Sequence, residues 1–135
     1  MRAVLAVAAA AGVWVVGSIA VGLGVESAAP VEQITDDVGR IAWYALPQFP
    51  VTFLMVLATA LVYGRSRLRG ALGAAVVLAP PLVDLVADVV LSVGADTPAS
   101  VIAVRALCFV AGAAAAWWLV LPAREQQNVF ARAGR

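Results

Sequence analysis

The sequence contains no histidine and no lysine, and its only cysteine is Cys108. The lack of histidine removes the commonest metal ligand and general base from the chain. A single cysteine excludes an intramolecular disulfide and a metal site built from several cysteines. We therefore expect no metal, no cofactor and no catalytic residues, and we predict that the protein is not an enzyme.

Charged residues are also scarce: they make up 13% of the chain, whereas 64% of the residues are hydrophobic. The mean hydropathy of +0.98 is far above that of a soluble domain. No basic patch with interleaved aromatic residues is present, so no nucleic-acid partner is expected. The use of arginine as the only basic residue, with much Ala, Val and Gly, is typical of a GC-rich bacterial genome and predicts a bacterial source.

Four long apolar runs are the main feature that is present, at residues 3–25, 41–63, 71–94 and 99–121. Each is about as long as the roughly 20 residues that a membrane-spanning helix requires. An outer loop at 26–40, two short connections and a tail at 122–135 complete the chain. The sequence therefore predicts one all-α membrane domain over residues 1–135, a polytopic four-transmembrane-helix bundle in contact with the lipid bilayer.

The charges outside these runs are segregated by side. Seven of the nine arginines belong to the N-terminus, the second connection and the tail, which lie on one side of a four-span chain: Arg2, Arg65, Arg67, Arg69, Arg124, Arg132 and Arg135. The other side carries Glu26, Glu32, Asp36, Asp37 and Asp96, with Arg40 as its one base. Short arginine-bearing segments stay in the cytoplasm. We predict a multi-pass protein of the bacterial plasma membrane with both termini cytoplasmic.

The first run has a competing interpretation as a cleaved signal sequence, with Ser18 and Ala20 around a cleavage site. Apolar character continues to Val25, which is longer than the core of a usual signal peptide. Cleavage would leave three spans and would not change the orientation of the others. The interpretation as a first membrane span is favoured.

The outer loop has a helical pattern of its own, with apolar residues at three- and four-residue spacing at Val31, Ile34, Val38, Ile41 and Ala45. This pattern predicts a short interfacial helix that lies along the outer membrane surface. The alternative is an ordered loop that simply leads into the second span. The spacing alone supports both.

The second span opens with two prolines, Pro47 and Pro50, within one turn. In one interpretation the regular helix starts at one of these prolines, because proline suits a first helical turn. In the other, the prolines unwind the backbone and create a polar entrance lined by Gln48 and Thr52.

Three ionisable residues lie inside the third and fourth runs: Asp84, Asp88 and Arg105. Charge at membrane depth costs roughly 2.5–3.5 kcal/mol at a helix centre, so each group needs a partner or a function. The turn around residues 96–98 is short, so the two spans must be antiparallel neighbours. Folding them about this turn places position 88 opposite position 105, which predicts direct contact between Asp88 and Arg105.

Asp84 lies one turn deeper on the same face, and its mirror position is Phe109, which carries no charge. Three outcomes are open: protonation, sharing of Arg105, or binding of a cation, a substrate or a partner helix. Pro80 and Pro81 precede Asp84 by one turn and predict a helix kink there. A kink beside an intramembrane acid is a feature of transporter helices, although prolines are also common in ordinary membrane helices.

Small residues follow Arg105 on one face of the fourth run, at Cys108, Gly112 and Ala116, and would let another helix approach closely. Four helices of this length enclose little interior volume, which favours assembly. The first functional prediction is therefore a membrane protein without catalytic activity that acts as an oligomer or as an accessory subunit of a membrane complex. The alternative is a small proton- or cation-coupled transporter or channel that uses Asp84 in a kinked third helix.

Overall fold

The computed structural model describes residues 1–68 and 70–121, and the regular secondary structure of these residues is entirely helical. The predicted cytoplasmic tail, 122–135, lies outside the described residues, as does Arg69.

Four helices of the described part are long and apolar enough to cross a membrane, which indicates a multi-pass membrane protein. They are α1 (Arg2–Ala28), the composite span Asp37–Tyr63, α5 (Ala71–Gly94) and α6 (Ala99–Val120). The composite span contains α3 (Asp37–Arg40), the π-helix η1 (Ile41–Ala45) and α4 (Gln48–Tyr63). The prediction of an all-helical protein with four membrane-length helices is confirmed, while its orientation across the membrane stays a prediction.

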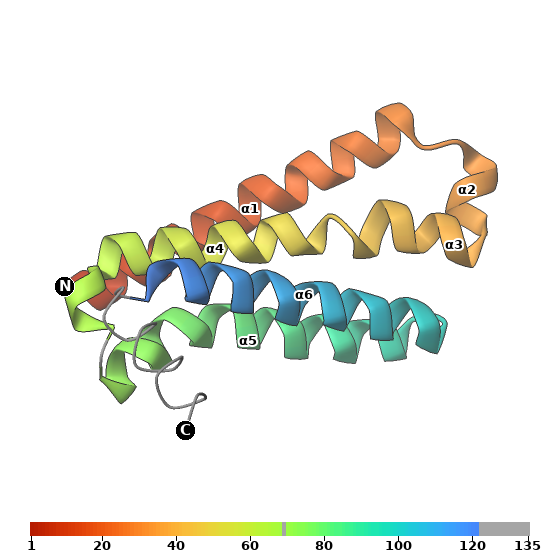
Figure 1. Ribbon diagram of the computed structural model, residues 1–135. Coiled ribbons are helices and arrows are strands. Elements are labelled where there is room, and N and C mark those ends of the chain that lie inside the picture. Colours follow the sequence, from red (N-terminus) through yellow and green to blue (C-terminus); the bar gives the residue numbers. More distant parts are fainter. Residues whose placement is uncertain (69, 122–135) are drawn as a thin grey trace, which may run out of the picture.

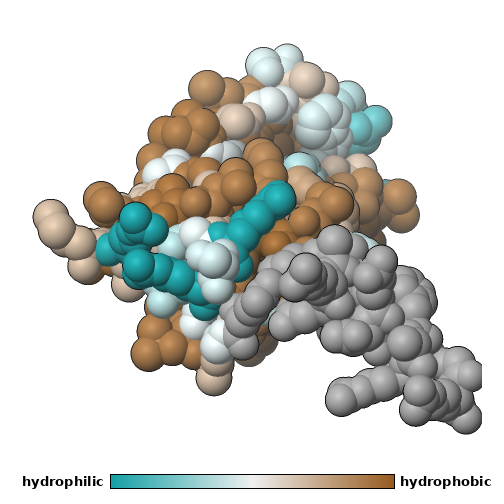
Figure 2. Space-filling model, turned by 60° about the vertical axis from the view of Figure 1, so that its left-hand side comes forward, coloured by the Kyte–Doolittle hydropathy of each residue, from teal (hydrophilic) through white to brown (hydrophobic). Residues whose placement is uncertain are grey.

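The N-terminus, the 3₁₀-helix η2 (Arg65–Arg67) and the last turn of α6 lie at one end of the bundle, which we call the arginine end (Figure 1). The opposite end, which we call the loop end, carries α2 (Val31–Thr35), α3 and the α5–α6 turn (Figure 1). Helix α1 stays close to α4 near the arginine end and diverges from it toward the loop end (Figure 1). In the space-filling view, hydrophilic residues gather at the ends and most of the visible side is hydrophobic (Figure 2).

Helix α4 occupies the centre of the bundle and packs along both α1 and α6, whereas α5 makes smaller contacts with α1, α4 and α6. The buried apolar cluster includes Ala6, Val56, Ala60, Val77 and Val120, from all four long helices. Helices α4 and α6 approach each other closely at Gly112. A Cβ atom built on Gly112 would lie 2.5 Å from the carbonyl oxygen of Phe49, so only glycine fits there. This confirms the expectation that small residues of the fourth span allow close helix packing.

The first connection does not form the single amphipathic helix that the sequence pattern predicts. It contains two short helices that are separated at Asp36. Helix α2 has only five residues and ends where Asp36 is extended, and α3 then begins the second span at Asp37 rather than at Ile41. The chain turns back closely at this point, because a Cβ atom on Gly39 would overlap the carbonyl oxygen of Gln33. Within the second span the regular hydrogen-bond pattern changes at Leu46 and Pro47, although both keep right-handed helical dihedral angles. The α-helix α4 then begins at Gln48, next to Pro47.

The α5–α6 turn depends on Asp96, the only non-glycine residue with positive φ (51°) in the described part of the chain. Aspartate tolerates this left-handed conformation, whereas a β-branched residue does not. We expect Asp96→Val to lower the free energy of unfolding by about 1–2 kcal/mol, and Asp96→Gly to retain wild-type stability. Thermal unfolding of both variants in detergent, followed by circular dichroism, checks this. Equal stability of the two variants would contradict the role of the turn.

Candidate functional site

The polar residues of α5 form one line along the helix. Asp84, Asp88 and Ser92 are spaced four residues apart, so they share a face of the helix. This face turns toward the other helices, because Ser92 is buried and both aspartates are half-buried. Helix α5 continues without a break through Pro80 and Pro81, and the predicted kink stays a prediction.

Asp84 accepts hydrogen bonds at both of its carboxyl oxygens. The indole N–H of Trp14 in α1 donates to Oδ1 at 2.8 Å, and the side-chain amide of Gln48 in α4 donates to Oδ2 at 3.1 Å. Helices α1 and α4 thus supply the hydrogen-bond partners of Asp84, which the fourth span, α6, does not. The carboxyl group connects α1, α4 and α5 at one level of the bundle.

Trp14 is a residue of the site that the sequence analysis missed. Tryptophans of membrane proteins usually lie at the two interfaces, where the ring N–H can reach water or headgroups. Trp14 instead lies near the middle of α1, so its N–H needs a partner inside the bundle. That position was the signal that could have identified it. Gln48 is likewise near the middle of the composite span, at the level of Asp84.

Asp88 and Arg105 form an ion pair between α5 and α6, with 2.7 Å from Nη2 to Oδ1, so the contact predicted from the mirror-image positions is confirmed. The exposed fractions of the side chains are 18% for Asp88 and 31% for Arg105. The Nε atom of Arg105 is buried and has no hydrogen-bond partner among the described residues. Together with the hydrogen bonds of Asp84, this ion pair connects each of the other long helices, α1, α4 and α6, to α5 through polar side chains.

Thr52 lies one turn after Gln48 and is fully buried, and its hydroxyl has no hydrogen-bond partner among the described residues. The role of Gln48 and Thr52 as a polar entrance stays a prediction. Gln48 and Thr52 have different surroundings, because Gln48 donates a hydrogen bond to Asp84 whereas the Thr52 hydroxyl is buried without a partner among the described residues.

We expect Thr52→Val to raise the free energy of unfolding by about 1 kcal/mol, because it replaces an unpaired buried hydroxyl with a methyl group of similar volume. Thr59→Val is the matched control, since Thr59 is equally buried but donates to the carbonyl oxygen of Met55 at 2.6 Å. Thermal unfolding in detergent compares the two. We expect Thr59→Val to lose stability, because it removes the hydrogen bond to Met55. An equal loss in Thr52→Val would show that the Thr52 hydroxyl has a partner.

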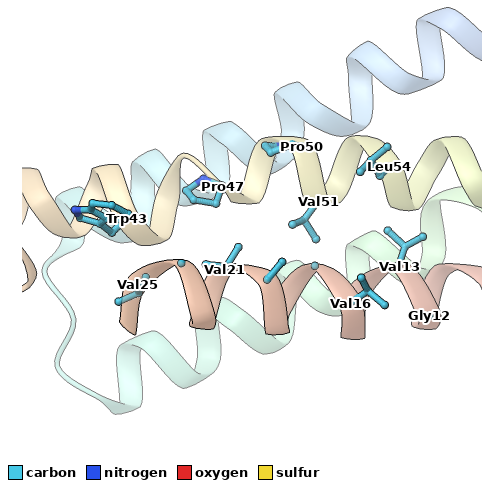
Figure 3. Close-up of a pocket in the computed structure, with 13 residues that line it drawn as sticks. Gly12, Val13, Val16, Val21, Val25, Trp43, Pro47, Pro50, Val51 and Leu54 are labelled. Carbon is cyan, nitrogen blue, oxygen red and sulfur yellow. The ribbon is translucent and has the colours of Figure 1, made fainter. Parts of the chain in front are cut away.

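Two large hollows flank α1. The first, of about 720 Å³, lies against α1 and α5 and is lined mainly by apolar residues, with Asp84 and Trp14 among its few polar lining groups. The second, of about 670 Å³, is an apolar groove between α1 and α4, where the two helices diverge (Figure 3). Val16 and Val21 of α1 and Pro50 and Leu54 of α4 line this groove.

The described residues bring together no group of three His, Cys, Asp or Glu side chains that could hold a metal ion. The contacts of the cluster are hydrogen bonds and an ion pair around two carboxyl groups. The comparisons with known proteins return nothing similar, since no protein family, no curated protein and no solved structure matches the chain.

Proposed function

We propose that this chain is a non-enzymatic integral membrane protein that works by lateral association within the bilayer, as an oligomer or as an accessory subunit of a larger membrane complex. The observation that carries the proposal is the internal use of its polar groups. Asp84 is held by Trp14 and Gln48, and Asp88 by Arg105. Intramembrane charges that bind one another stabilise a bundle and leave its apolar surface for neighbours.

The apolar groove between α1 and α4 supports the same proposal. Helix α1 is poorly covered, with only Ala6, Ala10 and Val25 buried along its length. Gly12 lines the groove and has no atom within 4 Å of an added Cβ position. Small residues beside open space allow the helix of a neighbouring subunit to approach closely. The occupant that we propose is a transmembrane helix of a second copy of this chain.

Gly12→Leu tests the association, because the Cβ atom of the new side chain has no neighbour within 4 Å and the side chain occupies the groove. We expect it to weaken self-association at least about tenfold, a change of roughly 1.4 kcal/mol, at unchanged thermal stability. Gly22→Leu is the matched control, since Gly22 is on the same helix and also has open space, but does not line the groove. Mass measurement in lipid nanodiscs and dilution series with fluorescently labelled protein give the two quantities.

A single chain per nanodisc at every protein density would contradict self-association. The accessory-subunit form would then require a second protein that is retained in stoichiometric amount when the native membrane is solubilised, and that is lost with Gly12→Leu but not with Gly22→Leu. Absence of both results would refute the proposal.

The alternative function, a proton- or cation-coupled transporter or channel that uses Asp84, has one observation in its favour. The polar face of α5 leads from Ser92 at the loop end to Asp84, which also lines the 720 Å³ hollow. Asp84→Asn is the decisive variant, because its amide oxygen can still accept from Trp14 while its NH2 group donates to the side-chain oxygen of Gln48 once that amide is turned over. Reconstituted vesicles with a trapped pH-sensitive dye would show flux for the wild type and none for Asp84→Asn. Equal, background-level flux in both favours the assembly function.

A further inference from the structure

A separate pocket of about 360 Å³ lies at the loop end, and its lining differs from that of the two apolar hollows. Helix α3, η1, α5, α6 and the α5–α6 turn each contribute a polar side chain to it. These are Arg40, Tyr44, Ser92, Arg105 and Thr97. The residues that line this small cavity thus carry two guanidinium groups and three hydroxyl groups, beside four apolar residues. Its volume is at the lower end of the range that is usual for small-molecule sites.

The charge of this pocket is positive although its surroundings are acidic. Arg105 is balanced by Asp88, but no carboxylate of the described residues forms an ion pair with Arg40. The Nε atom of Arg40 donates a hydrogen bond to the carbonyl oxygen of Ile34, at 3.0 Å, which orients the guanidinium. The acids of the loop end, Glu26, Glu32, Asp36, Asp37 and Asp96, are all exposed, and none lines the pocket.

We propose that this pocket binds the oxyanion of a phosphate group, with Arg40 as its principal charge and Arg105 as the second guanidinium. A planar guanidinium donates two parallel hydrogen bonds to such an oxyanion. The hydroxyl groups of Tyr44, Ser92 and Thr97 supply further donors around it. In a membrane-spanning bundle the loop end lies at headgroup depth, so the phosphate belongs either to a lipid headgroup or to a small soluble phosphoester.

The test uses the full chain, purified and delipidated in a sugar detergent, and follows thermal unfolding by tryptophan fluorescence. Three probes are titrated: phosphatidylglycerol, glycerol 3-phosphate, which carries a phosphate group without acyl chains, and dioleoylglycerol, which has acyl chains without phosphate. We expect phosphatidylglycerol to raise the unfolding temperature and dioleoylglycerol to leave it unchanged. A response to glycerol 3-phosphate as well would identify the phosphate group alone as sufficient, whereas its absence would identify a lipid headgroup as the ligand.

Variants assign the binding to the pocket. Arg40→Gln should weaken phosphatidylglycerol binding at least about tenfold, because it removes a charged hydrogen-bond donor. Arg65→Gln at the arginine end is the control and should bind as the wild type does. If Arg40→Gln does not fold, Tyr44→Phe replaces it, with a loss of several-fold expected from one missing hydroxyl. Failure of both phosphate probes to stabilise the wild type, or equal binding by the wild type and the pocket variant, would overturn the proposal.

This experiment is independent of the association test. Gly12→Leu changes the groove between α1 and α4, whereas Arg40→Gln changes a pocket that shares no lining residue with it. A protein that self-associates without binding phosphate, or that binds phosphate as a monomer, would therefore separate the two proposals.

Discussion

Arg105→Leu is expected to lower the free energy of unfolding by about 3 kcal/mol, because it leaves the Asp88 carboxylate without its partner between α5 and α6. The ion pair has 2.7 Å between Nη2 and Oδ1, and Asp88 is mostly covered by the bundle. An unpaired charge at this depth opposes both insertion and packing. The yield of folded protein in the membrane and the thermal unfolding temperature in detergent should both fall.

The double variant Asp88→Asn with Arg105→Leu distinguishes a lost pair from general damage to α6. It removes both charges, so it should recover most of the stability that Arg105→Leu alone loses. Arg65→Leu is the control for the loss of an exposed arginine and should remain close to the wild type. If the double variant is no more stable than Arg105→Leu, the ion pair does not explain the loss.

Gly112→Val is expected to have a comparable effect through packing alone. An added Cβ atom would lie 2.5 Å from the carbonyl oxygen of Phe49 and 3.3 Å from the backbone nitrogen of Phe53. Both contacts are with backbone atoms of α4, so no side-chain rotation can relieve them and the two helices must move apart. Overpacking of this kind costs about 1–3 kcal/mol or more.

Gly112→Ala should show a smaller loss of the same sign, since it adds the first clashing atom without the branched side chain. Gly12→Ala is the matched control in another membrane helix, because no atom lies within 4 Å of its Cβ position. Unfolding temperatures of the three variants in detergent give the comparison. Wild-type stability of Gly112→Ala would contradict the close approach of α4 and α6.

The sequence by itself determined the membrane-length helices and one of the three polar contacts of the cluster, the ion pair of Asp88 and Arg105. Long apolar runs predict membrane-length helices, because every backbone group must be hydrogen-bonded within its own segment in lipid. The contact between Asp88 and Arg105 was predictable because a short turn makes α5 and α6 antiparallel neighbours and matches positions at equal depth. For the start of α4 the sequence offered Pro47 and Pro50 as alternatives, and the structure places the start at Gln48, directly after Pro47.

Only the tertiary structure decided which residues hold Asp84. Its partners Trp14 and Gln48 are 70 and 36 residues away in the chain, and no short turn sets their position relative to α5. The apolar pattern gives no guidance, because lipid accepts an apolar helix face as readily as another helix does. The central place of α4 depends on close fits such as that of Gly112 against Phe49, which arise only when the helices are packed together.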